Sequence, residues 1–266
     1  DNATNDGSFV PAVDEGDLET SWTIPVIVDS HAYRTELILA NPGNANATYA
    51  LTFVDSISRP SVPLVATLPM PARRQATIPD VFELFGVGVW AGETQTRAGT
   101  LRITALEEEA VGAFVGVRVL TRQEGGRFGV YAPTVPAGSV DADQGFLWGL
   151  RADAQTRSNV AVLNAGEAEG GDITLQLQAI DGSTGRPAGS PLTVTLEPGR
   201  WAQPDGFFAK SGVVHGDVRI VRVSGEGPWW AYGVVNDGEA PGKGTGDGSF
   251  VPVGFTGAPQ PLPEGA

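Results

Sequence analysis

The chain has 266 residues, of which 41% are hydrophobic, and this length suits one large domain or two ordinary ones. Its formal net charge of -14 argues against a nucleic-acid partner, because phosphate binding requires clustered lysine and arginine. The absence of cysteine excludes disulfides, zinc–thiolate sites and thiol chemistry, and no apolar run approaches the roughly 20 residues of a membrane helix.

The segment at the start of the chain, residues 1–14, contains the hexapeptide DGSFVP at 6–11, and the same hexapeptide returns at 247–252. In both places a glycine-containing turn leads into a short apolar stretch that stops at proline. We therefore expect residues 1–14 to be equivalent to the last strand of a β-sandwich. The predicted assembly strands are Ser8, Phe9, Val10 and Pro11 near the start and Ser249, Phe250, Val251 and Pro252 near the end.

Between these two segments the chain repeats itself at an offset of about 120 residues. Five segments match in the same order, and this predicts two homologous domains. The matched pairs are Arg34–Gly43 with Arg157–Gly166, Leu64–Gln75 with Leu192–Gln203, Pro79–Gly86 with Pro204–Gly212, Gly99–Thr104 with Gly216–Val221, and Phe114–Val119 with Ala231–Asn236.

The strand pattern of the two repeats predicts an all-β fold. Short runs rich in β-branched and aromatic residues are separated by Gly, Pro, Asn and Asp. We expect two tandem antiparallel β-sandwiches of the immunoglobulin or fibronectin type III kind, at 15–138 and 139–254, with acidic linkers at 12–21 and 138–145. A Pro/Gly-rich extension follows at 255–266. The predicted strands are 36–41, 49–55, 99–104, 112–119, 159–164, 173–181, 192–196, 217–223 and 229–235.

One helical turn is predicted in each repeat, at 79–86 and 204–212. Pro79 and Asp80 suit a helix start, and Gly86 suits a left-handed cap. We expect Phe82 and Phe207 to plug one end of each sandwich.

The sequence offers little for catalysis, and we expect no enzyme. His31 and His215 lie at non-equivalent points of the repeats, and neither has a nucleophile-elbow sequence nearby. The acidic run Glu107–Glu109 lies between two predicted strands, so a solvated hairpin turn is the favoured interpretation. An enzyme that uses paired carboxylates remains an alternative.

Calcium is a candidate ligand. Three glycine-containing loops carry oxygen-bearing side chains at alternate positions, as hard cations require, but none has EF-hand spacing. Ordinary turns capped by Asp or Asn are the alternative. The candidate calcium ligands are Asp1, Asn5, Asp6, Asp141, Asp143, Asp237 and Asp247.

Two features of the sequence bear on carbohydrate. Trp229 and Trp230 are candidates for stacking on sugar rings, although neighbours on a strand face opposite ways, so we expect one in the core and the other exposed or at a domain junction. Asn2 and Asn46 begin NAT sequons and are formal glycosylation acceptors.

The combination YGVVNDG…GDGSFVPV, together with the N-terminal DNATNDGSFVPAV, resembles the closing strands of tandem immunoglobulin- or fibronectin-III-like β-sandwich modules in large secreted bacterial surface or filament proteins. The resemblance implies a non-catalytic module at an extracellular or cell-surface location. It carries no catalytic residues over to this chain.

These observations lead to two functional hypotheses. In the first, the chain is a subunit or repeat unit of an extracellular filament or surface fibre, assembled head to tail with copies of itself through terminal strand exchange or docking. In the second, it is an accessory carbohydrate-binding or adhesion module of a secreted hydrolase, with a polysaccharide or glycan as partner. An array predicts another copy upstream, whereas an accessory module predicts a different upstream domain.

Overall fold

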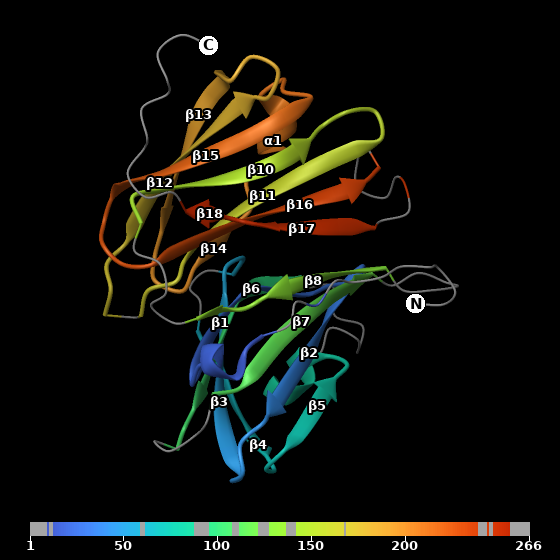
Figure 1. Cartoon of the computed structure of the whole chain (residues 1–266), viewed down its shortest axis with the longest axis vertical. Helices are drawn as coiled ribbons and strands as arrows, with labels where there is room; N and C mark the ends of the chain where they lie inside the picture. Colours follow the sequence, from blue (N-terminus) through green and yellow to red (C-terminus); the bar gives the residue numbers. More distant parts are fainter. Residues whose placement is uncertain are drawn as a thin grey trace.

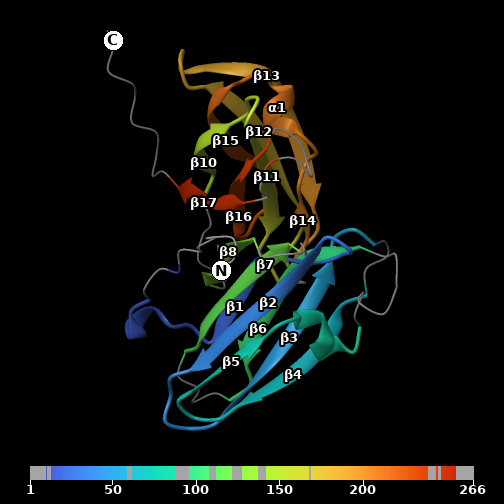
Figure 2. The same cartoon turned by 90° about the vertical axis from the view of Figure 1, so that its right-hand side faces the viewer.

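The computed structural model describes residues 10, 13–58, 62–87, 96–107, 112–121, 128–136, 142–167, 169–238, 244 and 247–255. These residues form two all-β domains stacked along the long axis of the molecule (Figures 1 and 2). Each domain pairs a five-stranded with a four-stranded antiparallel sheet. The prediction of two tandem β-sandwiches is therefore confirmed.

The first domain has the sheet orders β4-β3-β6-β1-β9 and β5-β2-β7-β8. A short 3-10 helix, η1 (Glu15–Asp17), precedes it. The five-stranded sheet contains β1 (Ser21–Asp29), β3 (Ala47–Asp55), β4 (Leu64–Met70), β6 (Arg97–Ala105) and β9 (Val135–Pro136). The four-stranded sheet contains β2 (Tyr33–Asn41), β5 (Arg74–Ile78), β7 (Phe114–Thr121) and β8 (Gly129–Pro133).

The second domain repeats this arrangement, with the sheet orders β13-β12-β15-β10-β18 and β14-β11-β16-β17. The five-stranded sheet contains β10 (Gln144–Arg151), β12 (Ile173–Asp181), β13 (Arg186–Leu196), β15 (His215–Ser224) and β18 (Gly254–Phe255). The four-stranded sheet contains β11 (Thr156–Asn164), β14 (Trp201–Ala202), β16 (Trp229–Asp237) and β17 (Gly248–Pro252).

Six strands of each domain follow the immunoglobulin order. Strands β1, β6 and β3 are ordered as B, E and D, and β2, β7 and β8 are ordered as C, F and G. The place of strand A beside B is taken by β9, which comes from the C-terminal end of the domain. In the second domain β18 takes the same place beside β10.

The first strand of each domain, β1 and β10, was missed by the sequence analysis, which assigned the start of each to an acidic linker. Both strands carry a register shift at the same place, between Ile24 and Ile27 in β1 and between Leu147 and Leu150 in β10. Gly149 has a φ of 75° within this bulge. A bulge tolerates residues that would break a regular ladder, so the breaker-containing pattern did not look like a strand.

All five matched sequence pairs fall on equivalent elements, but two of them are out of register. In one, the Asn41 and Asn164 amides bond to the Met70 and Leu196 carbonyls, so the match of 64–75 with 192–203 is displaced by two residues. The other is the match of 114–119 with 231–236. Leu37 and Val160 are equivalent positions of β2 and β11; Leu37 pairs with Val117, whereas Val160 pairs with Gly233. The segment 114–119 therefore corresponds to 230–235, not to 231–236. A slip of one residue exchanges the two faces of a strand, so side chains of the two domains can be compared only in the corrected register.

In each domain a buried side-chain hydroxyl joins the two sheets by hydrogen bonds. The Oγ1 atom of Thr35 donates to the Val28 carbonyl (2.9 Å) and accepts from the Val28 N–H (2.8 Å). Ser158 makes the same two bonds to Arg151, each 2.8 Å long. The repeat thus preserves a polar contact that satisfies backbone groups beside the bulge.

The repeated asparagine also has a structural role. The Nδ2 atom of Asn41 donates to the Met70 carbonyl (3.3 Å), and its Oδ1 accepts from the Gly43 N–H (3.0 Å). Asn164 bonds in the same way to the Leu196 carbonyl (3.1 Å) and to the glycine two residues further on. Each asparagine therefore joins the end of one sheet to the other.

Each domain has a tryptophan in the same part of its core, but the two domains supply it from opposite sheets. In the first domain Trp22, on β1, donates its indole N–H to the Ala113 carbonyl (2.9 Å). The equivalent of Trp22 is Gly145, and the equivalent of Ala113 is Trp229, whose indole N–H donates to the Ala142 carbonyl (2.5 Å). A Cβ added to Gly145 would lie 3.1 Å from the Trp229 ring. The same part of the core is filled from opposite sides.

The predicted helical turns are present. In η2 (Val81–Phe85), Asp80 caps the start and Gly86 ends the turn with a φ of 65°. In α1 (Phe207–Lys210), both phenylalanines are buried and Phe208 is fully enclosed. Phe82 is fully buried as well, so aromatic side chains from the helical turns complete each core.

Candidate functional site

The closing segment of the second domain, Gly248–Phe255, bridges its two sheets. Strand β17 is the edge of the four-stranded sheet and pairs with β16 from Tyr232–Pro252 to Asn236–Gly248. The chain then crosses to the five-stranded sheet, where β18 pairs with the start of β10. The segment therefore pairs with both sheets through its main chain, along one side of the sandwich.

All four predicted assembly residues near the C-terminus, 249–252, lie in β17. The Phe250 ring stacks on Tyr232 at 5.0 Å and on Trp230 at 6.0 Å between centroids, on the outer face of the sheet. Of the N-terminal copy, only Val10 is described, and its side chain is 45% exposed. Ser8, Phe9 and Pro11 lie outside the described residues.

This outer face of the four-stranded sheet packs against one end of the first sandwich. Strand β17 lies next to β8 at the junction (Figure 1). Phe250 packs against the core of the first domain, and Val26 and Val135 of the first domain join the core of the second. Phe250, which packs against both cores, therefore links them across the junction.

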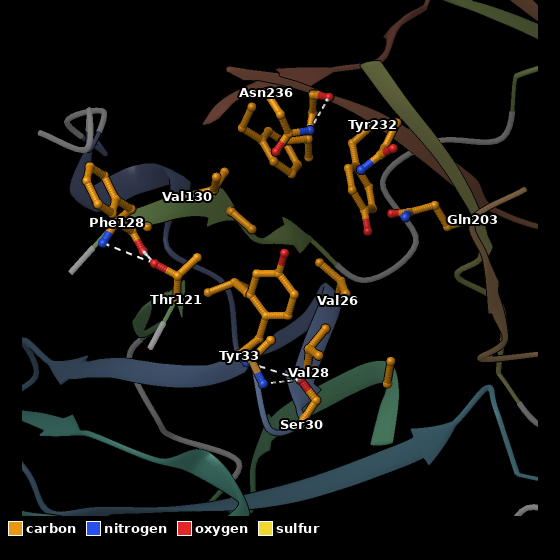
Figure 3. Close-up of a pocket in the computed structure, with 18 of the residues that line it drawn as sticks. Val26, Val28, Ser30, Tyr33, Thr121, Phe128, Val130, Gln203, Tyr232 and Asn236 are labelled. Carbon is orange, nitrogen blue, oxygen red and sulfur yellow. Dashed lines mark hydrogen bonds between the residues drawn. The ribbon is translucent and has the colours of Figure 1, made fainter. Parts of the chain in front are cut away.

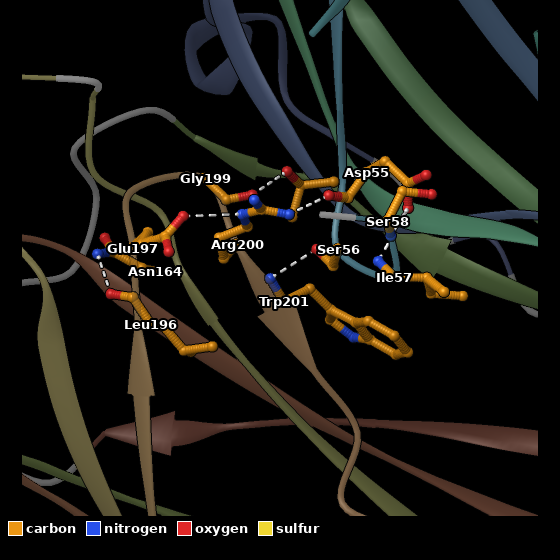
Figure 4. A network of polar contacts seen from close by, with 11 residues as sticks. Asp55, Ser56, Ile57, Ser58, Asn164, Leu196, Glu197, Gly199, Arg200 and Trp201 are labelled. Carbon is orange, nitrogen blue, oxygen red and sulfur yellow. Dashed lines mark hydrogen bonds and ion pairs between the residues drawn. The ribbon is translucent and has the colours of Figure 1, made fainter. Parts of the chain in front are cut away.

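A buried arginine forms the centre of a polar network at the junction (Figure 4). The Arg200 side chain is 7% exposed, donates to the Asp55 carbonyl of the first domain, and pairs with Glu197 at 3.2 Å. Beside it, the Trp201 N–H donates to the Ser56 hydroxyl at 3.0 Å. These bonds join the β13–β14 turn to the turn after β3.

Three further contacts, made by Thr100 and Arg102, extend this network. The Thr100 hydroxyl donates to the Gly199 carbonyl at 2.5 Å. Arg102 pairs with Glu167 at 3.0 Å, and the carboxylate of this pair is largely exposed. Arg102 also donates to the Ala165 carbonyl of the second domain at 3.3 Å. The bond from Thr100 is shielded from solvent, whereas solvent screens the ion pair between Arg102 and Glu167. Arg200 and Thr100 therefore contribute most to the polar part of the junction.

A cavity of about 440 Å³ lies between the domains beside this network (Figure 3). Its walls are mostly apolar on both sides. The first domain contributes Val26, Val28, Tyr33, Ala98, Val119, Phe128, Val130 and Ala132, and the second contributes Trp201, Tyr232, Val234 and Phe250.

A few polar groups punctuate the apolar walls. The Tyr232 side chain is 2% exposed, and its hydroxyl accepts from the Trp201 indole N–H at 2.8 Å. Burial raises the pKa of Tyr232 far above its ordinary value, and the bond from Trp201 opposes this only in part. Gln203, Asn236 and His31 also line the cavity.

The predicted sugar-stacking pair is buried. Trp229 is 1% exposed in the core, and Trp230 is 8% exposed on the face toward the first domain. One core and one junction position match the expectation for neighbours on a strand, but neither ring offers a face to solvent. Among the described tryptophans, Trp148 is the exposed one at 49%, and its ring stacks on Phe146 at 5.6 Å.

The described candidate calcium ligands have protein partners. Asp143 pairs with Arg222 at 3.0 Å, and the Oδ1 atom of Asp247 accepts from the Gly248 N–H at 2.7 Å. The Asp237 N–H donates to the Asp247 carbonyl at 2.9 Å. Within the described part of the chain, no three His, Asp or Glu side chains converge to hold a metal ion. The candidates outside it are Asp1, Asn5, Asp6 and Asp141.

The two histidines lie in different domains. His31 borders the cavity, and His215 is exposed on β15 with its Nε2 atom 3.5 Å from the Ser183 hydroxyl. Asn46 is exposed, and its Oδ1 accepts from the Ala72 N–H at 3.0 Å. Asn2 lies outside the described residues.

The interpretation of Glu107–Glu109 as a hairpin turn is wrong. The segment connects β6 to β7, which belong to different sheets, so it is a crossover. Glu107 accepts from the Thr48 N–H at 2.7 Å, and this bond lowers the pKa of its carboxyl group. Residues 108 and 109 lie outside the described chain.

The fold and the junction define a tandem β-sandwich protein whose two hydrophobic cores are linked by Phe250. A scan against known protein families matches none of them, and a search of curated proteins finds no relative. No helix in the described residues is long and apolar enough to cross a membrane.

Proposed function

We propose that this chain is a non-catalytic structural protein, a subunit or repeat unit of an extracellular filament or surface fibre that assembles head to tail with copies of itself. The observation that carries the proposal is the second DGSFVP hexapeptide, which forms the edge strand β17 of a sandwich. The first hexapeptide, at 6–11, has the same residues. A segment that suits this edge can be supplied by another molecule through main-chain hydrogen bonds.

The junction between the domains supports the same proposal. A filament needs contacts that fix one domain on the next, and here the apolar face around Phe250 and the buried Arg200 provide such a contact. The second domain already contains its own β17, so assembly requires that the incoming strand displace this segment or dock beside it. The filament model is therefore one of strand exchange or docking, with the chain itself as partner.

Electron microscopy tests the proposal directly. We would compare the intact chain, a variant that lacks residues 1–13, and a matched variant with these thirteen residues scrambled, which preserves length and charge. Regular filaments of the intact chain that vanish in both variants are the expected result. Two-lobed single particles that are the same in all three proteins contradict filament assembly through this segment.

A cysteine pair separates exchange from docking, because the chain has no cysteine of its own. Ser249 pairs with Val235 in β17 and β16, and Ser8 has the same place in the hexapeptide as Ser249. Strand exchange therefore predicts a ladder of disulfide-linked oligomers for Ser8→Cys with Val235→Cys. Docking predicts filaments without the ladder. The control, Ser58→Cys with Val235→Cys, should remain monomeric.

A second candidate function is carbohydrate binding in an accessory or adhesion module. Trp148 favours it, because nearly half of its side chain is exposed and it stacks on Phe146. Affinity electrophoresis in gels that contain neutral polysaccharides tests this candidate with the Trp148→Ala variant. Retardation of the intact chain that is lost in the variant would favour it, and equal migration in every gel would count against it.

A further inference from the structure

We infer that the cavity between the domains is a binding site for a small, uncharged molecule with an apolar body and an oxygen that accepts a hydrogen bond. This inference does not rest on the filament proposal. The cavity of about 440 Å³ lies within the range of ligand sites, about 300–1,000 Å³, and such sites favour domain interfaces.

The walls select an apolar body. Valines line the first-domain side, while the rings of Trp201, Tyr232 and Phe250 line the second-domain side. In Figure 3 the rings of Tyr33 and Tyr232 project into the cavity from opposite walls. Burial of flat apolar surface between aromatic and branched aliphatic side chains is the main source of affinity in sites of this kind.

The Tyr232 hydroxyl selects an acceptor. It accepts the indole N–H of Trp201, which leaves its own proton to donate, and no described residue accepts that proton within hydrogen-bond distance. Tyr232 is a buried residue, so its donor gains from a partner, because an unmet buried polar group carries a desolvation cost. A carbonyl, ether or hydroxyl oxygen of a ligand meets this need.

The charges around the cavity argue against an ionic ligand. Arg157 is the guanidinium that lines it, and its Nη1 atom donates to the Asp237 and Gly238 carbonyls at 3.2 and 3.0 Å. The remaining described walls offer apolar groups, amides, hydroxyls and the imidazole of His31. A charged ligand would lose its hydration there without a dedicated counter-charge.

Nile red is a suitable probe, because it is uncharged, has a fused aromatic body and carries a carbonyl acceptor. Its fluorescence rises and shifts to the blue in an apolar site. We expect the intact chain to bind it with saturable 1:1 stoichiometry. The Val119→Phe variant, which fills the cavity from the first-domain wall, should bind about tenfold more weakly or worse.

Two variants complete the test. Val65→Phe is the matched control, because Val65 is 66% exposed on β4, away from the cavity, and its affinity should equal that of the intact chain. Tyr232→Phe retains the ring and removes the proton, so binding should weaken several-fold and the bound emission should move further to the blue. Circular dichroism verifies that each variant is folded.

Some outcomes overturn the inference. Fluorescence that does not saturate with the intact chain would do so, as would equal affinity in the intact chain and folded Val119→Phe. If Val119→Phe does not fold, the decision falls to Tyr232→Phe. Unchanged affinity together with unchanged emission in that variant would remove the assigned role of the hydroxyl.

Discussion

The outer face of the four-stranded sheet is built differently in the two domains, although its strands are equivalent. In the second domain this face carries Trp230 and Val234 and is covered by the first domain. In the first domain the equivalent positions are Phe114 and Arg118, and Arg118 pairs with Glu36 at 2.9 Å. One backbone therefore supports an apolar docking face in one copy and a charged face in the other.

The two hydrophobic cores also differ in side chains on equivalent strands. Each domain needs one large indole in the same volume, but Trp22 enters from β1 and Trp229 from β16. The volume and the hydrogen bond of the indole N–H are preserved, while the strand that supplies them is not. Packing constrains the sum of side chains across the core more strongly than the residue at one position.

The largest expected effect on stability comes from removing either indole. Trp22→Ala and Trp229→Ala should each lower the free energy of unfolding by about 3–5 kcal/mol, because each leaves a cavity and an unpaired carbonyl. Denaturant titration followed by circular dichroism measures this. Trp148→Ala, at an exposed site, should stay within about 0.5 kcal/mol of the intact chain.

A double variant sharpens the comparison of the cores. Trp22→Gly with Ala113→Trp places the first-domain indole on the strand used by the second domain. The double variant should be more stable than Trp22→Gly alone, and a double-mutant cycle measures the coupling. Strictly additive effects would mean that the two arrangements are not interchangeable.

The next effect concerns the junction. Arg200→Met should cost about 1.5–3 kcal/mol, because the bond to the Asp55 carbonyl is charge-assisted and largely enclosed. It should also separate the unfolding of the two domains in calorimetry. Arg102→Met is the comparison variant: it removes the exposed pair with Glu167 and a longer bond, 3.3 Å, to the Ala165 carbonyl, so it should cost less than Arg200→Met. A single sharp transition in both variants would show that apolar contacts alone couple the domains.

The hydroxyls of Thr35 and Ser158 should contribute equally to the stability of their domains. Thr35→Val and Ser158→Ala each leave a buried N–H and carbonyl without their partner, so each should cost about 1–3 kcal/mol in a urea titration. A difference between the two larger than that range would indicate that one domain rearranges to satisfy the freed backbone.

The smallest effect appears only at high pH. Burial raises the pKa of Tyr232 in the folded state, so its contribution to stability is complete below the unfolded pKa of about 10 and is lost as pH rises above it. Stability should fall by up to about 1.4 kcal/mol per pH unit there. Tyr232→Phe should flatten this decline in urea titrations at pH 9 and 11, and parallel profiles would contradict it.

The sequence by itself determined the all-β class, the two repeats and both helical turns. Strand periodicity, glycine caps and the paired Asn–Gly motif depend on local backbone geometry, which residue type reports directly. The repeated hexapeptide also located the strand that carries Ser249–Pro252, although not its partner across the fold.

Only the tertiary structure decided where the domains meet. The bulges that disguise β1 and β10, the one-residue shift in β16 and the cavity around Tyr232 depend on contacts between segments far apart in the chain. Arg200 and Trp201 looked like ordinary members of a repeat, because burial depends on a neighbouring domain rather than on sequence neighbours. Local patterns report local geometry, whereas a junction is set by the shapes of two finished surfaces.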